Sequence, residues 1–261
     1  MPAVDETRFP RTDTVREFYD SLAPQYDAMT GFAGRFEKEL APIRALVGRY
    51  SIKRALDAGC GSGFHAIVLA QLGVDVTALD LSPEMVHLTG ENARRHRVEV
   101  RTFLGGFRDI PSEWGETFDG VFVMGNSLPH LLSHEELGET LGSLMSVLRR
   151  GGRLIIQCLN YERILSRKDH ILNAKEVDGV LITREYEYDS EGILFSIVTR
   201  EGGKTGSVEK RETVRLRPVL EEELTGLLTA LGAETESFGN ILLEPYHPST
   251  STDLVMIAAK M

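Results

Sequence analysis

A short glycine-rich turn and one carboxylate carry the strongest chemical signal of the sequence. The turn reads Asp57-Ala58-Gly59-Cys60-Gly61-Ser62-Gly63 after an apolar segment, and Asp80 ends the next apolar segment. Glycine lets the backbone turn sharply and lets a ligand approach where a Cβ would block it. At the edge of an open α/β sheet, an acid placed like Asp80 accepts hydrogen bonds from ribose hydroxyls. The pattern therefore predicts a ligand that contains adenosine.

Two classes of enzyme place an adenosine ligand at such a turn. Dinucleotide-binding folds have the pattern G-x-G-x-x-G, but the sixth position counted from Gly59 is Phe64. The pattern here is instead D-x-G-x-G-x-G, which resembles that of class I methyltransferases that use S-adenosylmethionine (SAM). We therefore favour SAM, with S-adenosylhomocysteine (SAH) as its product, over NAD. An NAD-linked reductase and a turn without any ligand are kept as alternatives.

Strands and helices alternate around this turn. Strands are predicted at 55–59, 74–80, 98–104, 118–124 and 153–159, and helices at 65–73, 82–95 and 134–149. Ser82 and Ser133 stand at the starts of two helices and are expected to cap them. Alternation with short links predicts a mostly parallel sheet covered on both faces. The fold class is therefore α/β, a doubly wound Rossmann-like sheet.

The pattern changes at both ends of this core. Helical spacing predicts helices at 14–27, interrupted by Pro24, and at 36–47. Three antiparallel strands are predicted at 180–188, 193–200 and 208–216, then a helix at 221–231 and strands at 234–238 and 254–259. We therefore divide the chain into an N-terminal helical cap (1–50), a SAM-binding core (51–165 and 219–261) and a small antiparallel β lid (166–218) inserted after the fifth strand.

Two further segments indicate which branch of these methyltransferases the chain resembles. Met124-Gly125-Asn126-Ser127-Leu128-Pro129-His130-Leu131 follows the fourth strand, and Leu159-Asn160-Tyr161-Glu162-Arg163-Ile164-Leu165 follows the fifth. They resemble the GNS-x-x-HL loop and the RNY-x-x-IL segment of the glycine N-methyltransferase and glycine/sarcosine N-methyltransferase branch. That branch also has an antiparallel lid where the three antiparallel strands are predicted.

The resemblance implies which residues hold the cofactor. Arg35 would pair with the methionyl carboxylate, and Asp80 would bind the ribose. The family has an Asn and Trp pair near adenine, and the matching positions are Gly106 and Phe107, so Phe107 can stack while Gly106 offers only its backbone. The full set of cofactor-binding candidates is Tyr26, Arg35, Asp57, Gly59, Gly61, Gly63, Asp80, Leu81, Gly106, Phe107 and Met124.

The same resemblance suggests an acceptor site with one important change. Asn126, His130 and Tyr161 are the candidate substrate-binding residues, and His130 is the one candidate for a base. His130 could instead only hold the Asn126 loop by hydrogen bonds, and Tyr161 could be a packing residue. The family Arg that clamps the carboxylate of glycine is replaced by Leu159. Losing such a pair costs about 3–5 kcal/mol, so glycine is not expected to be the acceptor. His65, which opens the helix behind the turn, is interpreted as structural.

These observations predict a SAM-dependent methyltransferase that acts on a small molecule, most simply on an amine or amino-acid nitrogen. SAM carries an activated methyl group, so alignment for an in-line displacement is the main task of the protein. The alternatives are O-methylation of a small acid or phenol, and a SAM-binding protein without transferase activity. The acceptor, the pathway and the oligomeric state are not predicted.

Composition and charge exclude several other classes. The formal net charge of −10 argues against a nucleic-acid partner, because nucleic-acid binding relies on Lys and Arg. No apolar run approaches the roughly 20 residues of a membrane span, and the polar N-terminus does not resemble a signal peptide. Cys60 and Cys158 have no metal-ligand spacing, so no metal is expected, and they suit a reducing cytoplasm.

Overall fold

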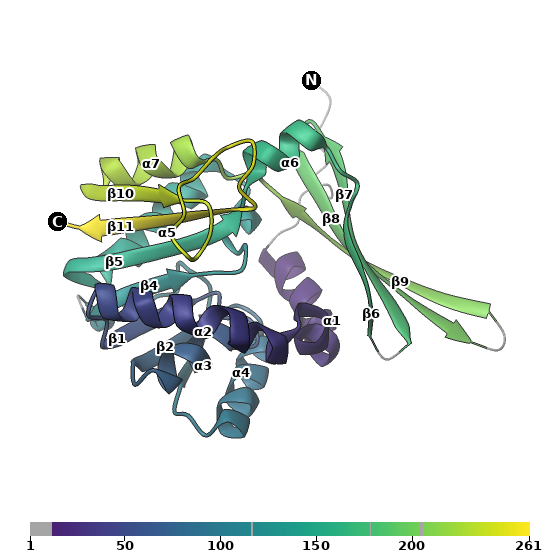
Figure 1. Ribbon diagram of the computed structural model, residues 1–261, viewed down its shortest axis with the longest axis horizontal. Helices are drawn as coiled ribbons and strands as arrows, with labels where there is room; N and C mark the ends of the chain where they lie inside the picture. Colours follow the sequence, from purple (N-terminus) through teal and green to yellow (C-terminus); the bar gives the residue numbers. More distant parts are fainter. Residues whose placement is uncertain (1–11, 116, 178, 204–205) are drawn as a thin grey trace.

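The central sheet of the protein is mostly parallel. The computed structural model describes residues 12–115, 117–177, 179–203 and 206–261. Seven strands lie in the order β10-β11-β5-β4-β1-β2-β3 (Figure 1). Their bounds are β1 Arg54–Ala58, β2 Asp75–Asp80, β3 Arg101–Leu104, β4 Phe118–Val123, β5 Leu148–Leu159, β10 Ala233–Phe238 and β11 Asp253–Lys260. The strands from β3 to β5 are parallel, β11 pairs with β5 in the antiparallel direction, and β10 pairs antiparallel with β11 at the edge. The predicted fold class is confirmed.

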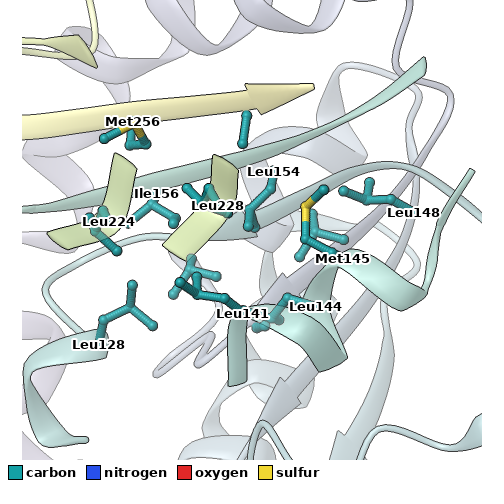
Figure 2. Close-up of a cluster of buried hydrophobic side chains, with 14 of the residues drawn as sticks. Leu128, Leu141, Leu144, Met145, Leu148, Leu154, Ile156, Leu224, Leu228 and Met256 are labelled. Carbon is teal, nitrogen blue, oxygen red and sulfur yellow. The ribbon is translucent and has the colours of Figure 1, made fainter. Parts of the chain in front are cut away.

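Helices cover both faces of this sheet. Their bounds are α1 Thr12–Thr30, α2 Phe32–Arg49, α3 Phe64–Gln71, α4 Pro83–His96, α5 His134–Ser146, α6 Tyr161–Arg167 and α7 Glu221–Ala230. Because successive strand residues point to opposite faces, Leu154 and Ile156 pack toward α5 and α7 whereas Ile155 packs toward α2 and α3. Figure 2 shows Leu141 of α5 and Leu228 of α7 in the first of these clusters. The two buried layers hold the carboxyl ends of β1, β2 and β4 in fixed positions.

A separate antiparallel sheet follows the fifth strand. It consists of β6 Ile171–Val177, β7 Val180–Asp189, β8 Gly192–Gly203 and β9 Gly206–Leu216, paired in that order. One face of this sheet packs against α1, with Phe18 and Leu22 of the helix buried against Tyr186 and Ile197 of the strands. In Figure 1 this sheet stands beside α1 and apart from the seven-stranded sheet.

Two predictions about helix starts are confirmed. The Ser82 hydroxyl accepts the backbone N–H of Met85 at 3.0 Å, and Pro83 is the first residue of α4. The Ser133 hydroxyl likewise accepts the N–H of Glu136 at 3.0 Å at the start of α5. Each cap satisfies one of the backbone donors that a helix start leaves unpaired. Both caps lie in segments that follow a strand of the central sheet.

Three elements differ from the prediction. Pro24 does not interrupt α1, because the helix continues through it to Thr30. Burial of Phe18, Leu22 and Met29 along one side of α1 outweighs the loss of one backbone hydrogen bond at Pro24. The antiparallel sheet has four strands and not three, since β6 was missed. A short helix, α6, was missed as well, although Asn160 caps it by accepting the N–H of Arg163 at 3.1 Å.

The structure describes only part of the predicted cap and lid. Residues 1–11 of the predicted cap lie outside the described residues, and within the predicted lid so do residues 178, 204 and 205. The helices α1 and α2 account for most of the predicted cap, and the four-stranded sheet lies within the predicted lid. In the described part of the chain, no helix has the length and apolar character needed to cross a membrane.

Candidate cofactor and acceptor site

A cavity of about 1060 Å³ opens at the carboxyl edge of the central sheet. Its walls come from the turn after β1, the end of β2, the loops after β3 and β4, and the N-terminal helices α1 and α2. This is where open α/β sheets bind ligands. Ten of the residues selected from the sequence line it: Tyr26, Arg35, Gly59, Gly61, Asp80, Leu81, Gly106, Phe107, Met124 and His130.

The first two glycines of the turn let the cavity walls approach closely. Gly59 has φ +71°, and a Cβ there would lie 2.9 Å from the Ser127 hydroxyl oxygen. Gly61 has φ +55°, and a Cβ there would meet the Tyr26 hydroxyl oxygen at 3.4 Å. Side chains at these positions would therefore be strained and would enter the space beside the cavity. The turn forms a cradle whose backbone is open to a ligand.

The third glycine has a packing role in the structure. Gly63 does not line the cavity. Its φ is +84°, and a Cβ there would lie 2.6 Å from the Thr89 side chain on α4. Gly63 therefore allows α3 and α4 to pack closely behind the turn, and its direct contact with a cofactor stays a prediction.

Asp80 braces the turn and also faces the cavity. One carboxylate oxygen accepts the N–H of Gly61 at 2.7 Å, and the other accepts the N–H of Ser82 at 2.9 Å. Burial raises the pKa of Asp80, while the backbone donors of Ser82 and Gly61 oppose the rise. A carboxylate oxygen can accept two hydrogen bonds, so each oxygen keeps a site for a ribose hydroxyl. This geometry fits the role predicted for Asp80.

Asp57 lies directly behind the turn and does not line the cavity. Its side chain is 1% exposed, and neither carboxylate oxygen has a hydrogen-bond partner of good geometry among the described residues. Burial raises the pKa of Asp57 to about 6, against the opposing charge of His65. Ionising a carboxyl group in this position costs free energy, so Asp57 lowers the stability of the folded protein when it is charged. Its predicted cofactor contact is untested.

Arg35 is held at the cavity by a network that the sequence did not reveal. Its Nε donates to Glu39 at 2.7 Å, and its Nη2 lies 3.2 Å from His65 Nε2. The guanidinium also lies over the Phe64 ring, 3.9 Å from its centre. Burial raises the pKa of Glu39, but hydrogen bonds from His65 and Arg35 outweigh it and hold the pKa at about 2. His65, interpreted as structural, therefore lines the cavity and helps to position Arg35.

At the predicted adenine end of the cavity, an acid lies in place of the missing side chain at position 106. The Gly106 N–H donates to Asp109 Oδ2 at 2.7 Å. A Cβ at Gly106 would lie 3.5 Å from the same oxygen and 3.7 Å from Leu81. The Asp109 carboxylate thus occupies the space beside Gly106, and both residues line the cavity with Phe107. Sequence reasoning missed Asp109, although an acid three residues after Gly106 was visible.

A tyrosine and a histidine meet in another part of the cavity wall. The Tyr19 hydroxyl oxygen lies 2.8 Å from His130 Nε2, and both residues line the cavity. Burial lowers the pKa of His130 to about 4 and raises that of Tyr19 well above 10.0. His130 Nδ1 is buried and has no hydrogen-bond partner among the described residues. We assign the imidazole proton to Nε2, because a buried unpaired N–H is costlier than a bare acceptor.

Asn126 and Tyr161 satisfy each other and do not line the cavity. Asn126 Nδ2 donates to the Tyr161 hydroxyl at 2.9 Å, and Asn126 Oδ1 accepts the N–H of Leu159 at 3.1 Å. Tyr161 is completely buried. These bonds join the loop after β4 to the end of β5, so the structure gives both residues a supporting place behind the cavity wall. Their predicted contacts with an acceptor are untested.

Comparisons with known proteins agree with this geometry. Residues 55–152 match the methyltransferase-domain family. Over 177 residues the chain is 32% identical to a glycine/sarcosine N-methyltransferase from Aphanothece halophytica. The alignment covers 68% of this chain and 67% of that protein. The relationship extends well beyond the glycine turn.

Solved structures share the fold at lower sequence identity. A SAM-dependent methyltransferase from Clostridium acetobutylicum aligns with a TM-score of 0.77 and 15% identity over 93% of this chain and 98% of that one. An amino pentose methyltransferase from Micromonospora echinaspora, with SAM bound, aligns with a TM-score of 0.69 and 20% identity. This alignment covers 90% of this chain and 96% of that one. The prediction of a SAM-dependent enzyme is confirmed, and the NAD alternative is set aside. The chain belongs to the class I SAM-dependent methyltransferases, in the branch that includes the glycine/sarcosine N-methyltransferases.

Proposed function

We propose that the protein transfers the methyl group of SAM to the nitrogen of a small amine. The observation that carries this proposal is one cavity lined by two unlike sets of residues. The glycine cradle and Asp80 form one set, and the neutral Tyr19 and His130 pair forms the other. The relatives reported above include a glycine/sarcosine N-methyltransferase and an amino pentose methyltransferase, and the first is named for methyl transfer to an amine nitrogen. An amine is the acceptor that these likenesses favour.

The residues of the cavity fit SAM along its whole length. Asp80 would accept the ribose hydroxyls, Phe107 would stack on adenine, and Asp109 would accept a hydrogen bond from the adenine amino group. Gly59 and Gly61 would lie against the methionyl part. Arg35 would bind the methionyl carboxylate through Nη1, the guanidinium nitrogen for which the described residues provide no hydrogen-bond partner. A charge-assisted pair of this kind is worth about 1.5–3 kcal/mol.

The chemistry required of the protein itself is modest. Bound SAM supplies a methyl group on a positively charged sulfur, which needs no further activation. Holding donor and acceptor in line supplies about 7–11 kcal/mol of the barrier. With a pKa of about 4, His130 is too weak a base to take a proton from an ammonium ion. The acceptor therefore binds as the neutral amine, and His130 acts by positioning the Tyr19 hydroxyl, whose oxygen keeps one acceptor site for an amine N–H.

We extend the proposal to the organisation of the chain and its surroundings. The described helices of the predicted cap (1–50) and the four-stranded sheet of the predicted lid (166–218) would close the acceptor side of the cavity, because Tyr19 and Tyr26 of α1 line that cavity and pack against the cluster that α1 shares with this sheet. The partner is a small-molecule methyl acceptor. The free cysteines Cys60 and Cys158 suit a reducing cytoplasm, where we place the reaction.

Transfer of a labelled methyl group tests the proposed function. The purified protein is incubated with SAM carrying an isotopically labelled methyl group and with separate panels of small amines, phenols and carboxylic acids. We expect label on nitrogen in at least one amine product and none with Asp80→Ala. Label found only on oxygen would replace N-methylation by O-methylation. SAM that binds and is never consumed with any panel would instead indicate a binding protein.

A further inference from the structure

We propose that Arg184, on the antiparallel sheet, binds an anionic group of the methyl acceptor. The acceptor would then be an amine that also carries a carboxylate or a comparable anion. The inference rests on the proposed function, because it concerns the binding of the methyl acceptor in the same cavity. It is carried by the placement of Arg184 and by the lack, among the described residues, of a hydrogen-bond or ion-pair partner for its charge.

Strand geometry places the Arg184 side chain on the face of the sheet that packs on α1. Ile182 and Tyr186 of β7 are buried at 4% and 2% exposure in the cluster that includes α1. Arg184 lies between them in an alternating strand and therefore shares their face. Its neighbour on β8 in the register is Ile197, another buried member of the same cluster. Paired residues of adjacent antiparallel strands also share a face.

This face meets two tyrosines that line the cavity. Tyr19 and Tyr26 of α1 pack against the same cluster and also form part of the cavity wall. The positive charge of Arg184 lies near enough to both hydroxyls to oppose the rise in their pKa that burial causes. Arg184 is half-buried. Arg184 is not itself among the residues that line the cavity, so its charge reaches the cavity beside the two tyrosines of the wall.

The charge of Arg184 has no counterpart in the described part of the chain. No hydrogen bond or ion pair to a described residue is found for it. Other arginines around the site are neutralised: Arg35 pairs with Glu39 at 2.7 Å, Arg215 with Asp189 at 2.8 Å and Arg217 with Glu223 at 2.9 Å.

The acid next to Arg184 in the sequence faces the other way. Glu185 pairs with Arg211 at 2.8 Å, and by strand alternation it lies on the opposite face of the sheet. Leu159, which packs against the same cluster as the Arg184 face, brings no charge. A half-buried guanidinium gains most from a bidentate anion. A ligand in the cavity would supply that anion.

The experiment measures anion binding separately from methyl transfer. The complex of the full-length protein with SAH is titrated calorimetrically with propionate and with propionamide, its neutral match. We expect wild type to bind propionate better, Arg184→Ala to lose that preference by about 10- to 100-fold in affinity, and Arg184→Lys to lose less. Arg211→Ala removes a cation from the opposite face of the same sheet and should behave like wild type.

Methyl transfer supplies the second readout. Glycine, sarcosine and β-alanine are each compared with their carboxamides. We expect the KM of an accepted amino acid to rise about 10- to 100-fold in Arg184→Ala, with the KM of its carboxamide and the Kd of SAM unchanged.

Three results would overturn the inference. Equal propionate binding by wild type and Arg184→Ala would show that the cation does not bind the anion. Equal binding of propionate and propionamide by wild type would show that the site has no anion preference. A fall in SAM affinity in Arg184→Ala, with no change for methylthioadenosine, would assign Arg184 to the carboxylate of the cofactor. Absence of methyl transfer to every amine would contradict the proposed function alone, since the propionate titration needs no turnover.

Discussion

Replacing Asp57 by Asn is expected to stabilise the ligand-free protein at neutral and alkaline pH. The Asp57 carboxyl is 1% exposed and lacks a hydrogen-bond partner of good geometry among the described residues, and burial raises its pKa to about 6. Asn has almost the same shape and no charge. The variant therefore avoids the cost of ionising a buried group, which the wild-type protein bears above pH 6.

The magnitude follows from the two pKa values. Below the unfolded value of 3.8 the carboxyl is protonated in both states, so it contributes no pH-dependent difference. As the pH rises from 3.8 to 6, the unfolded state loses its proton first and becomes favoured, and the effect is complete above pH 6. At 1.36 kcal/mol for each pH unit, ionisation costs the folded state about 3 kcal/mol at pH 8 and about 1.5 kcal/mol at pH 5.

Urea unfolding of the ligand-free protein at pH 5 and pH 8 measures this effect. Asp57→Asn should have the higher free energy of unfolding at both pH values, with the larger gain at pH 8 and an unchanged dependence on urea. Asp75→Asn, at an exposed position on β2, is the control. A gain of the same size at both pH values, or a loss at pH 8, would refute the reasoning. If Asp57 also serves the cofactor site, as predicted, the variant binds SAM more weakly.

Three further predictions concern the cavity. Gly63→Ala should lower the free energy of unfolding by about 1–3 kcal/mol, because the new Cβ meets Thr89, while SAM affinity measured by calorimetry changes little. Asp109→Ala should weaken SAM binding by about 10-fold and leave 5′-inosyl analogues, which lack the adenine amino group, unaffected. The pH profile of kcat/KM should follow the pKa of the free amine acceptor. It should have no inflection near pH 6.5 from His130, because burial lowers the pKa of His130 to about 4. An inflection that disappears in His130→Asn would contradict this prediction.

The sequence predicted best what depends on local pattern. Alternating apolar strands and capped helices follow from residue spacing, so the parallel sheet and the Ser82 and Ser133 caps were found. Packing between distant segments has no such signal. Helix α1 continues through Pro24 because the antiparallel sheet covers its apolar side. Strand β6 was missed because its residues are largely exposed and show no clear alternation.

The candidate site divides in the same way. Gly59, Gly61 and Asp80 were selected from their spacing, and all three line the cavity. Of the two partners of Arg35, Glu39 lies four residues further along α2 and could have been selected from its spacing. His65 could not, because it lies on α3, which only the fold brings to α2. The direction in which a side chain points could not be predicted from the sequence either. Asn126 and Tyr161 match acceptor motifs, yet the fold turns them toward each other.

The central claim, that the glycine turn and Asp80 form the SAM site, is tested most directly by calorimetric titration of the purified protein with SAM. Wild type should bind SAM with micromolar affinity and should not bind NADH. Asp80→Ala should bind SAM at least about 10-fold more weakly, with circular dichroism checking that it folds, because it loses the ribose acceptor and the brace on Gly61. Asp75→Ala, at the other end of β2, should match wild type. SAM binding that is absent, or equal in Asp80→Ala and wild type, would contradict the account.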